Sequence, residues 1–293
     1  MALSGGTPVK STPVNKLLFW TTGRTVLAKL STSFATQTLK DSMKNPFDLS
    51  GQVAIVTGAN TGIGQGIALA LAQAGADIAA VGRSPANDTV ARIRELGRKA
   101  EIITADLSTT EPIQRVVDET LDKLGGLHIL VNNAGIIRRA DALEFTEADW
   151  DVVMDTNLKS VFFLCQAAAR HMVGQGAGKI INIASMLSFQ GGIRVPSYTA
   201  SKAGIAGLTK LLANEWAAKG ICVNAIAPGY IATNNTTALQ ADETRNRQIR
   251  ERIPAGRWGK PEDLGGAAVF LASSAANYVQ GHILAVDGGW LAR

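Results

Sequence analysis

The hydrophobic and polar positions of this chain follow two alternating periods. From Gln52 onward, short apolar runs rich in β-branched residues are followed by longer segments whose apolar residues recur with helical spacing. The short runs predict strands at Val53–Thr57, Asp77–Gly82, Glu101–Thr104, His128–Val131, Lys179–Ala184, Cys222–Ile226 and His282–Val286. The longer segments predict helices near Gly64–Ala74, Asp88–Leu96, Glu111–Leu124, Trp150–Met172, Ser197–Lys219 and Pro261–Ser273.

This alternation predicts the fold class. Strands that alternate with helices form right-handed βαβ units, and nearly continuous apolar strands are expected where helices cover both faces of a sheet. We therefore expect a single α/β domain of the doubly wound, Rossmann type, with a parallel seven-stranded sheet flanked by helices. One long stretch, from about Pro228 to Arg257, has no clear period. It is interpreted as an irregular connection that is either a lid over a site or a plain surface loop.

The first 44 residues differ from the rest in charge. They hold six Lys or Arg residues and one acid, which accounts for the whole formal charge of +5. The segment is also rich in Ser and Thr, which is typical of a leader, and its apolar run at 17–20 is too short to span a bilayer. We expect residues 1–42 to be a disordered leader or a non-native extension, Met43 to be the natural start, and residues 43–293 to form the folded domain.

The balanced charge of residues 45–293 argues against a nucleic-acid partner, because such a protein needs basic residues gathered on its folded part. No membrane partner is expected. The two cysteines, Cys165 and Cys222, lie in a helix-like and a strand-like apolar pattern. They are interpreted as buried, reduced thiols of a cytoplasmic protein, with neither a disulfide nor a metal site.

The segment after the first strand predicts a phosphate site. Glycines 58, 62 and 64 lead directly into a helix, where the chain turns sharply, approaches a pyrophosphate closely and presents free N–H groups. Tight turns also select glycine, so this triplet alone is weak support. The expected cofactor contacts in this loop are Gly58, Asn60, Thr61, Gly62, Ile63 and Gly64.

The spacing of these glycines resembles that of the short-chain dehydrogenase/reductase family, and the resemblance extends over residues 46–293. It includes Asp106-Leu107 after the third strand, Asn132-Asn133-Ala134-Gly135 after the fourth and Pro228-Gly229 after the sixth. It implies an NAD(P)-dependent oxidoreductase acting on CH–OH groups, assembled as a homotetramer through the helices near Trp150–Met172 and Ser197–Lys219. The catalytic residues that it implies are Asn157, Ser185, Tyr198 and Lys202. The further cofactor contacts that it implies are Arg83, Asp106, Leu107, Asn133, Ala134, Gly135, Tyr198, Lys202, Pro228, Gly229, Ile231 and Thr233.

The chemistry of these residue types agrees with hydride transfer between an alcohol and a ketone. Oxidation needs a base for the hydroxyl proton, and a phenol with an ordinary pKa near ~10 is too weakly acidic for that role. Lys202 follows Tyr198 by four residues, so both lie on one helix face and the ammonium group favours the phenolate. Ser185 ends a strand, where its hydroxyl can bind the reacting oxygen. In the family, Asn157 holds a water that links Lys202 to solvent.

The cofactor preference is left open between NAD and NADP. An acid at the end of the second strand selects NAD by repelling the 2′-phosphate of NADP, but here Gly82 stands in its place. The following Arg83 can bind a 2′-phosphate or stack on adenine. These residues favour NADP slightly, whereas the branch of the family that this chain most resembles usually uses NAD.

That branch is the 2-dehydro-3-deoxy-D-gluconate 5-dehydrogenases, also described as 2-deoxy-D-gluconate 3-dehydrogenases, which act in uronate degradation. The resemblance lies in residues 133–139, 185–198, 232–236, 253–259 and 286–290. It implies the interconversion of 2-dehydro-3-deoxy-D-gluconate and 3-deoxy-D-glycero-2,5-hexodiulosonate. The side chains available for the carboxylate and hydroxyls of such a sugar acid are Arg138, Arg139, Gln190, Arg194, Asn235 and Arg257.

Two alternatives remain. A 3-oxoacyl carrier-protein reductase or another sugar dehydrogenase of the family would share every catalytic residue. A non-catalytic, cofactor-sensing protein on the same fold would be expected to lack catalytic groups, whereas all four are present.

Overall fold

The computed structural model describes residues 45–293, and the leader expected over residues 1–42 lies outside the described residues. The described part is built on a parallel sheet of seven strands in the order β3-β2-β1-β4-β5-β6-β7. The strands are β1 (Val53–Thr57), β2 (Asp77–Gly82), β3 (Ala100–Thr104), β4 (Ile129–Asn132), β5 (Gly178–Ile183), β6 (Ile221–Pro228) and β7 (Ile283–Val286). The predicted sheet is confirmed, with strand ends shifted by at most two residues.

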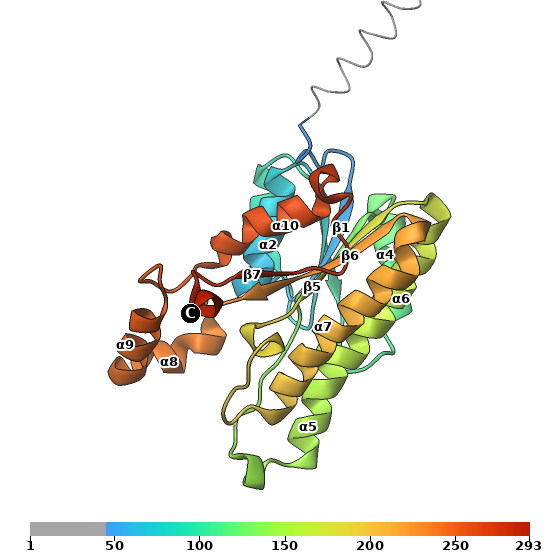
Figure 1. Cartoon of the computed structure of the whole chain (residues 1–293). Helices are drawn as coiled ribbons and strands as arrows, with labels where there is room; N and C mark the ends of the chain where they lie inside the picture. Colours follow the sequence, from blue (N-terminus) through green and yellow to red (C-terminus); the bar gives the residue numbers. More distant parts are fainter. Residues whose placement is uncertain (1–44) are drawn as a thin grey trace, which may run out of the picture. The chain divides into compact units, whose positions relative to one another are not determined.

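Helices cover both faces of the sheet (Figure 1). One core joins the sheet to α2 (Gly62–Gln73), α3 (Asn87–Glu95) and α10 (Gly265–Ala272). A second core joins the other face to α4 (Ile113–Leu124), α6 (Ser160–Gln175) and α7 (Pro196–Trp216). The predicted doubly wound fold is therefore confirmed. Since the strand order reverses between β1 and β4, a crevice is expected beyond the carboxyl ends of these two strands.

The long helix predicted over Trp150–Met172 consists of three pieces. α5 (Glu147–Met154) begins earlier than predicted, because the side chain of Thr146 accepts a hydrogen bond from the backbone N–H of Asp149 and caps the helix. A π-helical turn at Asp155–Lys159 then leads into α6. Such turns inside helices are frequent at functional sites, and this one contains Asn157.

The prediction that the connection between Pro228 and Arg257 is irregular was wrong. It contains a 3₁₀ turn (Asn234–Thr236) and two short helices, α8 (Thr237–Ala241) and α9 (Glu243–Arg252), and we call residues 233–253 the insert. Asp242 caps the start of α9, because its carboxylate accepts a hydrogen bond from the N–H of Arg245. Ile249 is the only buried residue of α9, so no apolar stripe marks this helix in the sequence.

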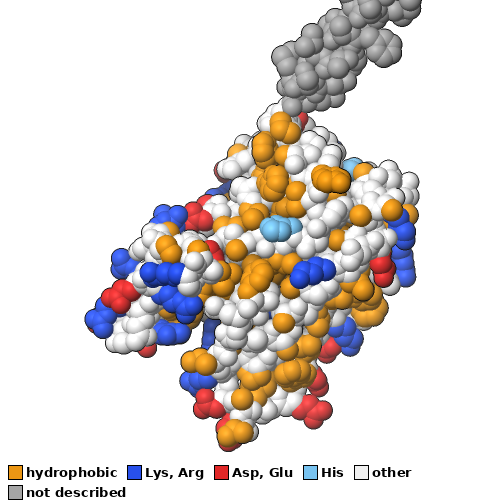
Figure 2. Space-filling model, in the orientation of Figure 1, with side chains coloured by type: hydrophobic (Ala, Val, Ile, Leu, Met, Phe, Trp, Pro, Cys, Tyr) orange, Lys and Arg blue, Asp and Glu red, His pale blue; other side chains and the backbone are white. Residues whose placement is uncertain are grey.

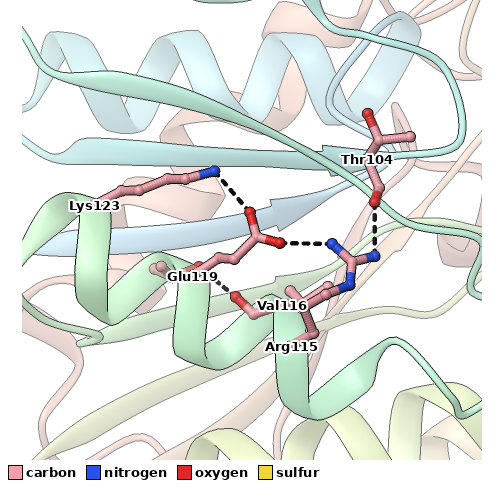
Figure 3. A network of polar contacts seen from close by, with 6 residues as sticks. Thr104, Arg115, Val116, Glu119 and Lys123 are labelled. Carbon is pink, nitrogen blue, oxygen red and sulfur yellow. Dashed lines mark hydrogen bonds and ion pairs between the residues drawn. The ribbon is translucent and has the colours of Figure 1, made fainter.

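The end of β3 is tied to α4 by an exposed network (Figure 3). Arg115 donates to the carbonyl oxygen of Thr104 at 3.0 Å and to the carboxylate of Glu119 at 2.6 Å. Lys123 donates to the same carboxylate at 2.7 Å, and these hydrogen bonds lower the pKa of Glu119. The network fixes α4 beside the sheet edge, at the strand end that precedes Asp106.

In the part of the chain that the structure describes, no helix combines the length and apolarity needed to cross a bilayer.

Candidate active site

The loop between β1 and α2 has the backbone that close approach of a diphosphate requires. Gly58 and Gly62 have φ angles of +67° and +58°, in the left-handed region that favours glycine. A Cβ on Gly58 would lie 2.8 Å from the side-chain nitrogen of Asn133, and a Cβ on Gly64 would overlap the carbonyl oxygen of Gly58. The side chain of Thr61 does not cap α2, so the first N–H groups of this helix are left for an anion. These residues fit the pyrophosphate of a dinucleotide.

The segment after β4 is fastened to this loop. The hydroxyl of Thr57 accepts hydrogen bonds from the backbone N–H groups of Asn133 and Ala134, both at 2.9 Å. The side chain of Asn133 donates to the carbonyl oxygens of Thr57 and Gly58. The carboxyl ends of β1 and β4 therefore form one rigid edge. The sequence analysis missed Thr57, although a polar residue that ends a buried strand directly before a glycine loop is a usable signal.

The ends of β2 and β3 form the next part of the expected dinucleotide site. The backbone N–H of Ser108 donates to the carboxylate of Asp106 at 2.9 Å and lowers the pKa of this group, and the nearby charge of Arg83 lowers it further. Arg83 and Asp106 are exposed, whereas Leu107 is buried. A Cβ on Gly82 would meet only the carbonyl oxygen of Ser84, at 3.6 Å, so there is space here for a side chain or a phosphate.

The end of β6 brings the insert beside the glycine loop. Pro228 ends this strand, and the N–H of Gly229 donates to the carbonyl oxygen of Val286 at 3.0 Å. Ile231 is buried. The methyl group of Thr233 lies 3.3 Å from the position that a Cβ on Gly62 would take. Thr233 therefore lies beside Gly62 of the glycine loop, and the cofactor contacts expected at Pro228, Gly229 and Ile231 stay a prediction.

Ser185 and Tyr198 meet beyond the carboxyl end of β5. Ser185 follows this strand, and Tyr198 lies in the first turn of α7. Burial raises the pKa of the half-buried Tyr198 phenol, while a hydrogen bond with the Ser185 hydroxyl and the positive charge of Arg139 oppose the rise. The structure therefore brings together an acid/base candidate and a hydrogen-bond donor for the reacting oxygen.

Lys202 lies on the same face of α7 as Tyr198. Its ammonium nitrogen is 5.6 Å from the centre of the Tyr198 ring and donates to the carbonyl oxygen of Ile183 at 2.6 Å. The side chain is buried, and burial lowers the pKa of Lys202 to about 8. A positive charge held here is able to act on the phenol, because the interior screens it only weakly.

Asn157 uses its side chain to hold the segment after the Asn-Asn-Ala-Gly motif. Its amide oxygen accepts from the N–H of Ile136 and its amide nitrogen donates to the carbonyl oxygen of Ile136, both at 2.9 Å. The same nitrogen lies 3.4 Å from the hydroxyl of Ser201, which sequence reasoning missed. The side chain of Asn157 is therefore engaged with the backbone after β4 and with α7, and the water-holding role that the family implies for this residue stays a prediction.

The candidate substrate residues divide into two groups. Arg138, Arg194 and Arg257 form ion pairs with Asp149, Asp141 and Asp263 respectively. Arg139 instead donates to the carbonyl oxygen of Asn235 at 3.4 Å, which joins the segment after β4 to the insert. Its guanidinium group is also the one whose charge acts on Tyr198. Gln190 is half-buried two residues after the turn that follows Ser185.

Comparisons with known proteins agree with this geometry. The family described as "Enoyl-(Acyl carrier protein) reductase" matches residues 58–291. A 2-dehydro-3-deoxy-D-gluconate 5-dehydrogenase of Escherichia coli (strain K12) is 61% identical over 248 residues, which is 84% of this chain and 98% of that protein. The protein of the same name from Bacillus subtilis (strain 168) is 57% identical over 252 residues, 86% of this chain and 99% of that protein.

A solved structure is also similar. It is described as a candidate 2-deoxy-D-gluconate 3-dehydrogenase from Agrobacterium tumefaciens with bound NADP. It is 60% identical to this chain with a TM-score of 0.79, and the match covers 85% of this chain and 100% of that one.

Proposed function

This chain belongs to the short-chain dehydrogenase/reductase family and is an oxidoreductase acting on CH–OH groups, and we propose that its substrate is a sugar acid. The proposed reaction interconverts 2-dehydro-3-deoxy-D-gluconate and 3-deoxy-D-glycero-2,5-hexodiulosonate. The names of two relatives matched over nearly their whole length support it. The observation that carries it in this chain is Arg139, a cation without an ion pair among the described residues, next to Tyr198 and the insert.

In the proposed mechanism the chain's own residues handle the proton. When bound, the nicotinamide ring supplies the acceptor or donor of the hydride. Tyr198 takes the proton of the substrate hydroxyl during oxidation and returns it to the ketone oxygen during reduction. Ser185 donates a hydrogen bond to the reacting oxygen, and Lys202 holds positive charge near the phenol. Asn157 fixes the backbone of Ile136 beside the site.

Arg139 is proposed to bind the carboxylate of the substrate. A guanidinium group matches a carboxylate in shape as well as charge, and its geometry allows two parallel hydrogen bonds. Arg138, Arg194 and Arg257 are less suited to this task because each already faces an aspartate. Gln190 and Asn235 remain the proposed partners of the sugar hydroxyls. Arginines of α9 add positive charge to the edge of the insert (Figure 2), which favours the approach of an acid.

The experiment that tests this function compares Arg139→Gln with Arg138→Gln. A charged hydrogen bond contributes about 1.5–3 kcal/mol, so Arg139→Gln should raise KM for the keto-sugar acid by roughly 10- to 100-fold. Arg138→Gln should stay within about twofold, because exposed ion pairs contribute little. Equal effects of both variants would contradict the proposed role of Arg139. Faster turnover of acetoacetyl thioesters than of any keto-sugar acid would favour a 3-oxoacyl carrier-protein reductase instead.

The cofactor is proposed to be NAD or NADP. An acidic residue at the end of β2 would exclude NADP, and this chain has Gly82 there instead. Gly82, the exposed Arg83 and the space beside them support acceptance of a 2′-phosphate. The similar protein of Agrobacterium tumefaciens, solved with NADP, supports the same reading. The glycine loop and the uncapped start of α2 are proposed to hold the pyrophosphate.

A homotetramer in the cytoplasm is also proposed. The side chains of Trp150, Phe163 and Leu211 on α5, α6 and α7 are 40–47% exposed, and hydrophobic side chains run along this side of the molecule (Figure 2). Light scattering at micromolar concentration tests the assembly, and a monomeric mass would contradict it. Cys165 and Cys222 are free and buried, as predicted, which suits a reducing compartment.

A further inference from the structure

A short turn connects the strand that ends at Ser185 to the helix that holds Tyr198. Ser185 has extended backbone and precedes the 3₁₀ turn Met186–Ser188, and its hydroxyl accepts a hydrogen bond from the N–H of Leu187 at 3.2 Å. The direction of the Ser185 hydroxyl therefore depends on how this turn is placed. The turn contains only three residues, so contacts with other elements must hold it.

Ser188 makes one of these contacts. Its hydroxyl donates to the backbone carbonyl oxygen of Lys202 at 2.6 Å, although the two residues are 14 positions apart. Lys202 lies inside α7, and a carbonyl oxygen has two lone pairs, so it can accept from Ser188 in addition to its helical partner. The bond thus joins the turn to α7 one helical turn after Tyr198.

A second bond reaches the same lysine from the other side of Ser185. The ammonium group of Lys202 donates to the carbonyl oxygen of Ile183. Ser185 therefore lies between two attachments to one residue of α7, at Ile183 before it and at Ser188 after it. Met186, inside the turn, packs in a cluster with Ile249 and Ile253 of the insert. The Ser188 bond adds a fixed point to the packing of this turn against α7.

We propose that Ser188 is a positioning residue, whose hydrogen bond to the Lys202 carbonyl keeps the Ser185 hydroxyl in reach of Tyr198 and of the reacting oxygen. This role rests on the proposed functions of Ser185 and Tyr198. Misplacement of a catalytic group by about 1 Å can lower turnover by as much as about 100-fold, so a single hydroxyl at this point has a measurable effect.

The test is a double-mutant cycle in which Ser188→Ala is made in the wild-type and Ser185→Ala backgrounds, with the best sugar acid of a panel as substrate. In the wild type, Ser188→Ala should lower kcat by about 5- to 50-fold and leave cofactor affinity within about twofold. In the Ser185→Ala background the same change should alter kcat by less than about twofold, since the group that Ser188 positions is gone. Ser188→Thr keeps the hydroxyl and should restore most of the lost turnover.

The pH profile provides a readout that loss of stability alone would not move. Because the hydrogen bond from Ser185 opposes the raised pKa of Tyr198, the apparent pKa of kcat for alcohol oxidation should rise in Ser188→Ala, as in Ser185→Ala. Ser273→Ala is the matched control. Its buried hydroxyl donates to the carbonyl oxygen of Phe270 in α10, which contributes no residue to the site, so its kcat and pH profile should match the wild type.

Two results would overturn the inference. One is wild-type kcat in Ser188→Ala, and the other is an equal loss in both backgrounds. If Ser188→Ala does not fold, Ser188→Cys takes its place in the cycle, because it keeps the volume and offers only a weak donor. Tyr198→Phe is assayed in parallel: full activity of that variant would reject the proposed catalytic residues themselves, whatever Ser188→Ala does.

Discussion

The ammonium group of Lys202 and the carbonyl oxygen of Ile183 are joined by a hydrogen bond of 2.6 Å in the interior of the protein. The bond ties α7 to the end of β5, where Ser185 follows. It also keeps a cationic side chain in a place that water barely reaches, which lowers the pKa of Lys202 from 10.5 to about 8. Lys202 therefore links α7 to β5, while the burial of its positive charge costs free energy.

This relationship predicts how stability depends on pH. Between about pH 8 and 10.5 the unfolded chain keeps its proton on Lys202 while the folded chain loses it, so the free energy of unfolding rises with pH in this window. Lys202→Met carries no such proton. Relative to this variant, the free energy of unfolding of the wild type should rise by up to about 3 kcal/mol from pH 8 to 10.5, measured by urea unfolding.

The difference in unfolding free energy between the wild type and Lys202→Met at pH 7 is a separate quantity, because Lys202→Met also leaves the Ile183 carbonyl without this donor. The test is the slope of the unfolding free energy against pH. Lys210→Met, an exposed position on the same helix, should give a curve parallel to the wild type. Parallel curves for Lys202→Met and the wild type would mean that Lys202 is not perturbed by burial.

The space beside Gly82 predicts a change in cofactor selectivity. Gly82→Asp should weaken NADP relative to NAD by about 1–3 kcal/mol, because a carboxylate repels the 2′-phosphate in a partly solvated site. A side chain fits here, since the nearest atom to the new Cβ is 3.6 Å away. Dissociation constants from fluorescence titration measure the ratio, and Gly82→Ala should leave it unchanged. Equal weakening of both cofactors by Asp would place the ribose elsewhere.

The proposed boundary at Met43 predicts that a chain beginning there is fully functional. No packed element of the domain is expected before this residue, so the shortened chain should match the full chain in melting temperature and turnover. Scanning calorimetry and a standard assay suffice. A fall of several degrees would show that residues 1–42 stabilise the domain.

The fold could be predicted from the sequence because its strands are buried on both faces and therefore appear as continuous apolar runs. All eight residues of β6 are buried, for example, and the run was recognised apart from its ends. α9 was missed for the opposite reason. Its charged residues favour a helix, but Ile249 alone is buried, and one apolar residue has no period.

The candidate site was predictable where the residues follow strand ends or share a helix face, as Ser185, Tyr198 and Lys202 do. It was not predictable where the partner of a side chain depends on the tertiary structure alone. Arg138 and Arg139 are neighbours with the same side chain, yet one pairs with Asp149 and the other reaches the insert. A bond from a side chain to a distant backbone carbonyl, such as that of Ser188, leaves no pattern in the sequence.

The contact between Ser185 and Tyr198 leads to the most direct test of the chemistry. Tyr198→Phe removes the phenolic oxygen and keeps the ring, so packing in the first turn of α7 is preserved while the proton has no acceptor. General acid–base groups contribute about 10²- to 10⁴-fold, and turnover should fall by at least the lower figure with little change in cofactor affinity. Tyr278→Phe makes the same change at a fully exposed tyrosine and should retain wild-type turnover. If Tyr198→Phe kept more than about a tenth of wild-type turnover on the best substrate, too small a loss for an acid–base group, Tyr198 would not be the residue that transfers the proton.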